Sequence, residues 1–324
     1  MTPAWTRSAA LLCLAGLVRS QTDPAQIRVD VSLVTVASTV FDRDGAFVPG
    51  LKLKDFRVSD NGAPRELQYL WAEQDLPLTV GLVVDVSGSQ RRVIEEHRAA
   101  VEQFFRQVLG PKDQAFLVTA GMDVKLVTDL TGSIDDLEKG VRKIDIRQRA
   151  GKPFGDSCVG PKGDRPLAPL CGGTALWNAV YASAKLKMKG ISGRKALIVL
   201  SDGMDTGSKH KLGDAIEMAQ SADTLVYTIR SVGVPMLVPI PLLRGKQQLG
   251  KLADETGGRA FTDPKGNASE VYAEIEKELR SVYVLGFAPP EGEKAAGRHK
   301  LDVKVERKGV TVRARREYVV PPAP

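Results

Sequence analysis

The sequence is poor in the side chains that most often build zinc centres or general-base sites. Of 324 residues, 3 are cysteine and 3 are histidine, and the histidines, His97, His210 and His299, are far apart in the chain. No phosphate-binding loop of the form G-x-x-x-x-G-K-[ST] occurs, so a nucleotide-driven role lacks its phosphate cradle. The longest apolar run is a short stretch near the N-terminus, and no other run is apolar for long enough to suggest a membrane anchor of the mature chain.

Residues 1–20 have the three-part layout of a secretory signal peptide. Arg7 precedes an apolar core over residues 9–18, and the small residue Ser20 comes before a polar stretch. The apolar core is too short to span a bilayer. We therefore expect cleavage near Ser20, export to the periplasm or the extracellular space, and no transmembrane anchor in the mature chain.

Export would leave two cysteines in an oxidising compartment. Cys13 lies inside the apolar core of the signal peptide, so Cys158 and Cys171 remain after cleavage. An even pair across a short loop rich in glycine and proline predicts a disulfide bond, worth about 3 kcal/mol on the chain-entropy model. Two free thiols or a metal-binding pair are less favoured alternatives, because no further cysteine or nearby histidine is available. The loop from Ala150 to Gly172 is a candidate specificity loop.

The charge balance is moderately basic. The formal net charge of +7 becomes +5 when Arg7 and Arg19 are subtracted with the signal peptide. A balance of this size, spread evenly along the chain, does not indicate nucleic-acid binding. It suits an acidic partner or a cell surface, and an ordinary soluble surface explains it more simply.

The stretch LTVGLVVDVSGSQ, residues 78–90, carries the strongest local signal. Its apolar, β-branched run predicts a strand buried on both faces, as in a parallel sheet. The run ends in Asp85, Ser87 and Ser89, whose side chains point the same way in an extended segment and converge beyond the strand's carboxyl end. Open α/β sheets bind ligands at that edge. Carboxylate and hydroxyl oxygens suit Mg²⁺, Mn²⁺ or Ca²⁺, unless the serines simply cap the next helix.

Two later stretches extend this pattern. Thr174 follows the glycine pair in CGGTALWNA, residues 171–179, and Asp202 ends the second buried apolar run, ALIVLSD, residues 196–202. The order D-x-S-x-S, then GGT, then a strand ending in SDG resembles the von Willebrand factor type A (VWA) domain with a complete metal-ion-dependent adhesion site (MIDAS).

The resemblance implies which side chains hold a metal. In that family two serines and a threonine coordinate Mg²⁺ through their hydroxyl oxygens, and two aspartates act directly or through water. Carried over to this chain, the metal-binding residues are Asp85, Ser87, Ser89, Thr174 and Asp202. The family leaves one coordination position for an Asp or Glu carboxylate of a protein partner. Arg91 and Arg92 follow the motif and either steer such an acidic group or are ordinary helix surface charge.

The strand and helix patterns predict an α/β domain between two β segments. Over residues 77–284, strands alternate with amphipathic helices, which predicts a doubly wound, mostly parallel sheet of the VWA type. The N-terminal segment, residues 21–76, has the alternating pattern of strands over residues 27–70 and then a linker, and residues 285–324 return to the strand pattern. The pieces VFDRDG, GL and DF in the first of these segments resemble the leader region of exported bacterial VWA proteins. Since each β segment is too small to be stable alone, we expect the two to pack together as one small β module.

A proline-containing apolar stretch, residues 232–243, interrupts the helical and strand patterns of the α/β domain. Its three prolines exclude a central strand. We expect a loop that covers a sheet edge rather than an exposed patch, followed by a helix over residues 246–256.

Together these features predict an exported, non-catalytic binding or adhesion protein. One alternative is an assembly or structural factor of the cell envelope that uses the same metal site for self-association. The other is a metal-dependent hydrolase, because bound Mg²⁺ can activate water. Hydrolysis also needs a positioned base, which the scattered histidines do not supply. Gly155-Asp156-Ser157 looks like a nucleophile turn but has no matching histidine, so the sequence favours a protein that is not an enzyme.

Overall fold

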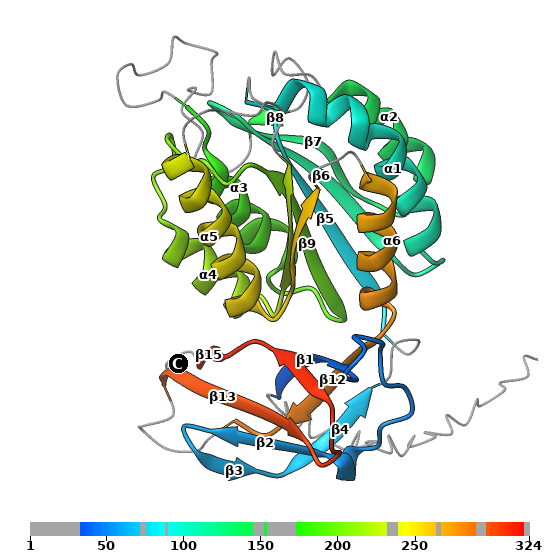
Figure 1. Ribbon diagram of the computed structural model, residues 1–324, viewed down its shortest axis with the longest axis vertical. Coiled ribbons are helices and arrows are strands. Elements are labelled where there is room, and N and C mark those ends of the chain that lie inside the picture. The colour runs from blue at the N-terminus through cyan, green and yellow to red at the C-terminus, as the bar shows by residue number, and fades with distance from the viewer. Residues whose placement is uncertain are drawn as a thin grey trace, which may run out of the picture. The chain divides into compact units, whose positions relative to one another are not determined.

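The structure is a computed structural model. Its larger part is a mixed sheet with helices on both faces (Figure 1). The structure describes residues 33–71, 76–87, 90–144, 152–153, 173–231, 239–263, 267–289 and 296–320. The strand order in the large sheet is β11-β10-β9-β5-β6-β7-β8. Neighbouring strands from β11 to β6 run parallel, whereas β7 is antiparallel to both β6 and β8. The predicted mostly parallel, doubly wound sheet is therefore confirmed.

The strands of this sheet are β5 (Leu78–Asp85), β6 (Gln114–Ala120), β7 (Val124–Thr131), β8 (Lys152–Pro153), β9 (Arg194–Ser201), β10 (Leu225–Ser231) and β11 (Ala260–Asp263). All eight residues of β5 are buried, as its apolar sequence predicts for a strand that is covered on both faces. Leu82 and Val84 join the core on one side of the sheet, and Val83 joins the core on the other.

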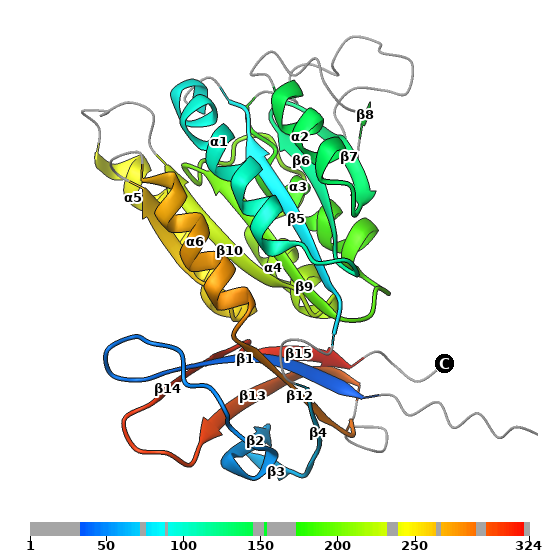
Figure 2. The ribbon, with the colours of Figure 1, turned by 90° about the vertical axis from the view of Figure 1, so that its right-hand side faces the viewer.

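Six α-helices cover the two faces in the part of the chain that the structure describes. One face carries α1 (Arg91–Val108), α2 (Ile134–Lys143) and α6 (Ala268–Leu279), which Figure 2 shows in front of the sheet. The opposite face carries α3 (Leu176–Ser183), α4 (Leu212–Ser221) and α5 (Pro239–Thr256). A π-helical turn, η4 (Ala184–Met188), continues α3. None of the described helices combines the length and the apolar character needed to cross a membrane.

The proline-containing stretch differs from its prediction. Residues 232–238 lie outside the described residues, but α5 already begins at Pro239, so the expected loop is wrong from that point. Proline is tolerated in the first turn of a helix, because the N–H groups there have no intrahelical acceptor. The side chain of Leu243 is 57% exposed, so the expectation of buried cover is wrong at that residue as well.

Two four-stranded antiparallel sheets form the β module, with orders β14-β1-β12-β4 and β15-β13-β2-β3. Their strands are β1 (Val34–Phe41), β2 (Phe56–Asp60), β3 (Ala63–Arg65), β4 (Leu67–Trp71), β12 (Val282–Phe287), β13 (Gly297–Val305), β14 (Thr311–Ala314) and β15 (Glu317–Val320), with a 3-10 turn, η1 (Leu53–Asp55), before β2. Each sheet combines strands from both ends of the chain, as predicted, and Val36, Phe56 and Phe287 belong to the shared core. Because β12 begins at Val282 and spans the boundary expected after residue 284, the exact division into domains stays a prediction.

The core of the β module contains a buried carboxylate, Asp60. Its Oδ1 lies 2.7 Å from Nδ1 of His299, and its Oδ2 accepts hydrogen bonds from the Arg65 guanidinium at 2.8 Å and from the Tyr318 hydroxyl at 3.0 Å. Burial alone would raise the pKa of Asp60, but the hydrogen bonds from His299, Arg65 and Tyr318 outweigh it and hold that pKa below 3.8. The partners of this buried charge come from both ends of the chain, so the network links the two halves of the module.

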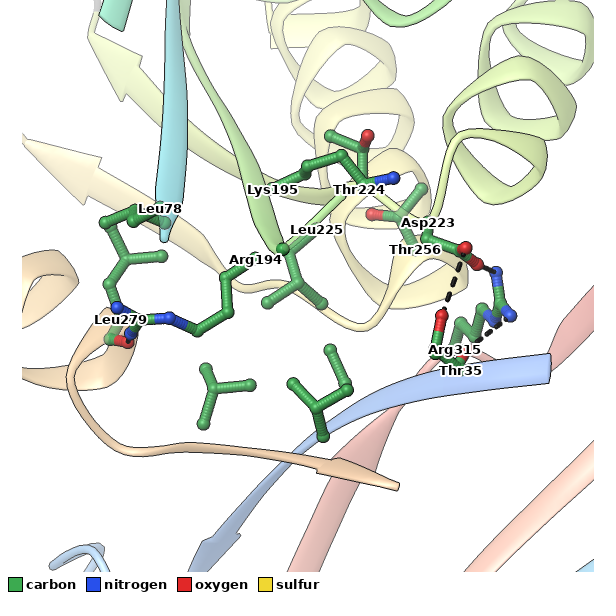
Figure 3. A pocket seen from close by; sticks show the side chains of 14 residues that line it. Thr35, Leu78, Arg194, Lys195, Asp223, Thr224, Leu225, Thr256, Leu279 and Arg315 are labelled. Carbon is green, nitrogen blue, oxygen red and sulfur yellow. Dashed lines mark hydrogen bonds and ion pairs between the residues drawn. The ribbon is translucent and has the colours of Figure 1, made fainter. Parts of the chain in front are cut away.

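Arg315 connects the β module to the α/β domain (Figure 3). It lies between β14 and β15, is 7% exposed, and donates to the carbonyl oxygens of Gln220 and Thr35, each at 2.7 Å. It also pairs with the carboxylate of Asp223, which accepts a further hydrogen bond from the Thr35 hydroxyl at 3.1 Å. The cavity beside these groups has a volume of about 30 Å³ and lies where β5, β9 and β10 begin. A volume of this size holds a water molecule rather than a substrate.

We predict that Arg315→Met destabilises the folded chain by about 2–3 kcal/mol, because two main-chain carbonyls lose a charged donor and Asp223 loses its ion-pair partner. The loss is limited because the Asp223 side chain is 40% exposed and water can replace part of the contact. Urea unfolding followed by tryptophan fluorescence measures the change. The matched control is Arg316→Met, which removes the neighbouring exposed arginine and should shift stability by less than about 0.5 kcal/mol. Equal effects of the two substitutions would contradict the role assigned to Arg315.

Candidate metal centre

Asp85 is the last residue of β5 and is 1% exposed. It lies where the parallel strands have their C-terminal ends, which is called the carboxyl edge of the large sheet. Its Oδ2 accepts a hydrogen bond of 2.6 Å from the hydroxyl of Ser201, and its Oδ1 accepts one of 2.8 Å from the backbone N–H of Ser87. Ser201 is the last residue of β9, the strand that pairs in parallel with β5. The two strands therefore end side by side, and a hydroxyl of one strand holds the carboxylate of the other.

Asp202 follows Ser201 directly and is 8% exposed. Its Oδ1 accepts a hydrogen bond of 2.9 Å from the backbone N–H of Met204, which fixes the turn after β9. Burial raises the pKa of Asp85 to about 6, hydrogen bonds from Ser201 and Ser87 partly oppose the increase, and the negative charge of Asp202 adds to it. The two aspartates are therefore close enough to repel each other.

Thr174 lies at the same edge, held there by its neighbours. The N–H of Ala175 donates to the carbonyl of Gly121 at 2.7 Å, and Gly121 follows Ala120, which pairs with Asp85 across β5 and β6. The hydroxyl of Thr206, in the loop after Asp202, accepts the Thr174 N–H at 3.1 Å. The chain thus brings Thr174 to the end of β6 and ties it to the loop that follows the second aspartate.

The glycine before this threonine is required by its surroundings. Gly173 has a φ of +103°, and a Cβ at that position would lie 1.7 Å from the hydroxyl oxygen of Thr206. Any side chain there would push the Thr206 hydroxyl away from the Thr174 N–H. The GGT part of the motif therefore has a steric reason in this structure.

Further polar residues of the loop after β9, which the sequence did not single out, fix that loop on α3. One carboxylate oxygen of Asp205 accepts hydrogen bonds from the N–H of Trp177 at 3.2 Å and from the Ser208 hydroxyl at 2.5 Å. The side-chain oxygen of Asn178 accepts the N–H groups of Lys209 and His210, each at 3.0 Å. These ties set the position of Thr174 relative to Asp202. Asp205 and Asn178 belong to no motif, so the sequence offered little sign of this role.

Several predicted residues cannot be placed. Ser89 and the pair Cys158 and Cys171 lie outside the described residues, as does the loop from Ala150 to Gly172 apart from β8. Arg91 and Arg92 lie in the first turn of α1, but the structure does not describe their side chains. The disulfide bond, the role of the loop and the steering role of the arginines therefore stay predictions.

The chemistry of the described residues fits a hard divalent cation. Asp85, Ser87, Thr174 and Asp202 lie at the same edge of the sheet, and carboxylate and hydroxyl oxygens suit Mg²⁺ better than zinc or copper. The groups that shift the pKa of Asp85 most include no positive charge. Among the described residues there is no group of three or more His, Cys, Asp or Glu that could hold a metal, so a centre here would need the hydroxyl groups as ligands.

Solved structures similar to this chain include proteins of the VWA type. A von Willebrand factor type A protein from Catenulispora acidiphila matches 91% of this chain and 75% of its own, at 13% identity and a TM-score of 0.46. The vWF domain of the type V pili tip protein Mfa5 from Porphyromonas gingivalis matches 62% of this chain and 94% of its own, at 12% identity and a TM-score of 0.44.

Proximal thread matrix protein 1 from the mussel byssus, in a structure with a zinc-occupied MIDAS motif, matches 68% of this chain at 13% identity and a TM-score of 0.47. The match spans about half of that protein, 49% of its length. No protein-family model and no curated protein matches the sequence. Because every one of these identities is 13% or lower and every TM-score is below 0.5, the similarities transfer no ligand or activity to this chain.

We predict that Asp85 destabilises the metal-free protein as the pH rises from about 4 to about 6. Its pKa in the folded state, about 6, is above the ordinary value of 3.8, so the folded state holds this proton more tightly than the unfolded state does. The destabilisation is complete above about pH 6 and is on the order of 3 kcal/mol. In EDTA, Asp85→Asn should therefore gain stability relative to the wild type across this range and keep the gain at higher pH.

Urea unfolding at a series of pH values measures this difference. The control is Asp60→Asn, because the folded-state pKa of Asp60 is lowered and its stabilising contribution is lost only as the pH falls below about 4. That variant should show no gain between pH 4 and 6. A flat difference between wild type and Asp85→Asn over the whole range would contradict the assigned pKa.

Proposed function

We propose that this chain is an exported, non-catalytic binding protein with a VWA domain that recognises an acidic group of a protein partner through a divalent cation. The proposed ligands are Asp85, Ser87, Ser89, Thr174 and Asp202, with Mg²⁺ as the expected ion and Mn²⁺ or Ca²⁺ as ions that the same donors accept. The observation that carries the proposal is the pair of buried carboxylates at the ends of two neighbouring strands, Asp85 in β5 and Asp202 directly after β9, with the Asp85 carboxylate bonded to the hydroxyl of Ser201.

The donor set explains why a partner's carboxylate would bind. Two aspartates and three neutral hydroxyls leave a divalent cation incompletely coordinated, and Mg²⁺ seeks six oxygen ligands in octahedral geometry. An Asp or Glu side chain from a partner replaces a water molecule in such a site and adds the negative charge that the cation favours. The contact then depends on the ion, the five ligands and the partner's carboxylate together.

The surroundings of the histidines support binding rather than hydrolysis. His97 is 1% exposed and packs edge-on against Tyr272, at 5.8 Å between ring centroids. His210 stacks on Tyr181 of α3 at 3.7 Å, and His299 lies in the β module beside Asp60. The three imidazoles thus lie at three separate places in the described part of the chain.

We predict that Asp85→Asn, Asp202→Asn and Thr174→Val each weaken Mg²⁺ binding by at least about tenfold, since each removes one oxygen ligand or its charge while nearly conserving volume. Isothermal titration calorimetry with Mg²⁺ measures the loss, and circular dichroism checks that the variants are folded. The control is Asp60→Asn, which removes a buried carboxylate of the β module and should leave Mg²⁺ affinity unchanged. Unaltered Mg²⁺ affinity in all three site variants would refute the ligand assignment.

We predict that Mg²⁺ changes binding much more than stability. With about millimolar Mg²⁺ and a dissociation constant near about 0.1 mM, mass action adds only about 1.4 kcal/mol to the free energy of unfolding. Capture of partner proteins from cell-envelope and extracellular fractions should nevertheless require Mg²⁺ and fail with EDTA or with Asp85→Asn. Sedimentation of the purified chain in Mg²⁺ and in EDTA tests the alternative, self-association through the same site. A larger species in Mg²⁺ than in EDTA indicates self-association, and an unchanged species indicates a foreign partner. Capture that is identical in EDTA would contradict a cation-mediated contact.

A further inference from the structure

Two of the four exposed large apolar side chains in the described residues belong to segments at the carboxyl edge of the large sheet. In the part of the chain that the structure describes, the exposed large hydrophobic residues are Tyr69, Met122, Leu186 and Leu243. Met122 and Leu243, exposed by 52% and 57%, belong to segments that contact the two aspartate turns. Exposed apolar groups gathered around a polar site often mark an interaction surface.

Met122 stands at the tip of a short, fixed turn after β6. The N–H of Val86 donates to the carbonyl of Ala120 at 2.8 Å, so the turn starts beside Asp85. Within the turn, the Gly121 N–H donates to the carbonyl of Asp123 at 3.0 Å. The carbonyl of Gly121 accepts the N–H of the residue after Thr174, as described above. The backbone of Met122 is therefore held between the Asp85 turn and the Thr174 segment, and the residue is about half exposed.

Two further apolar residues lie on the side of Asp202. Met204 is partly exposed, and its N–H binds the Asp202 carboxylate directly. The first turns of α5 touch the same loop, since a Cβ on Gly245 would lie 2.4 Å from the carbonyl oxygen of Asp202. Leu243 precedes this contact by two residues. In the large sheet β5 lies between β9 and β6. Met204 and Leu243 therefore lie on the β9 side of the two aspartates, and Met122 lies on the β6 side.

We propose that the partner segment carries an Asp or Glu with apolar residues next to it, so that the carboxylate reaches the cation while the apolar neighbours cover Met122, Met204 and Leu243. This inference rests on the proposed function and adds the chemistry of the partner to it. Methionine suits such a surface, because its flexible thioether side chain adapts to differently shaped apolar partners. A polyanion such as an acidic polysaccharide satisfies the cation but leaves the apolar side chains in water.

Selection of short random peptides displayed on phage against the immobilised wild-type chain in Mg²⁺ tests the proposal. Enriched peptides should contain an Asp or Glu flanked by Leu, Ile, Phe or Val, and the enrichment should vanish in EDTA and with Asp85→Asn. A synthetic enriched peptide should bind the triple variant Met122→Ser, Met204→Ser, Leu243→Ser at least about tenfold more weakly by fluorescence anisotropy. The Mg²⁺ affinity of that variant should stay within about twofold of the wild type, because no proposed ligand is changed.

The matched control is the double variant Tyr69→Ser, Leu186→Ser, which removes the other two exposed apolar side chains and should bind the peptide like the wild type. Enrichment of acidic peptides with polar or charged neighbours, or unchanged binding by the triple variant, would overturn this inference and leave the proposed function standing. A selection with no difference between Mg²⁺ and EDTA would overturn both.

Discussion

The candidate centre depends on one buried charge, the carboxylate of Asp85. It lies at the end of a strand that is covered on both faces, where desolvation opposes ionisation and the nearby Asp202 adds repulsion. The Ser201 hydroxyl and the Ser87 amide hold it in one orientation but supply no positive charge. A carboxylate so placed is costly for the fold unless a cation compensates it. The position therefore makes more sense as part of a binding site than as a contribution to stability.

Backbone hydrogen bonds hold the segment of Thr174 at the same edge of the sheet as that carboxylate. Thr174 is far from Asp85 in sequence, yet its segment is fixed to the end of β6 on one side and to the loop after β9 on the other. Asp205 and Asn178 fasten this loop to α3. At the opposite end of the strands, Arg315 ties the β module to the α/β domain through main-chain carbonyls and Asp223. The β module thus attaches where β5, β9 and β10 begin, at the end of the sheet opposite to Asp85 and Asp202.

Most of the fold could be predicted because its signals are local. A continuous apolar run predicts a strand covered on both faces, and β5 is buried throughout. Alternating strands at both ends predict one β module, and β1 pairs with β12. The prediction of a loop in the proline stretch is wrong from Pro239 onwards, because proline is excluded from helix interiors but not from a first turn, and α5 starts at that residue. The carboxylate network around Asp60 was also missed, since its partners lie in different strands and share no sequence pattern.

By itself the sequence determined the types of the oxygen donors and the strand ends at which they stand, because both follow from residue order and from the two-residue period of a strand. Only the tertiary structure decided which of these segments lie side by side. Parallel pairing of β5 with β9 places Ser201 against Asp85, and the loop contacts bring Thr174 to the same edge. The tertiary structure also decided that Met122 and Leu243 are exposed near that edge. Burial depends on which segments pack together and not on the hydrophobicity of a residue alone.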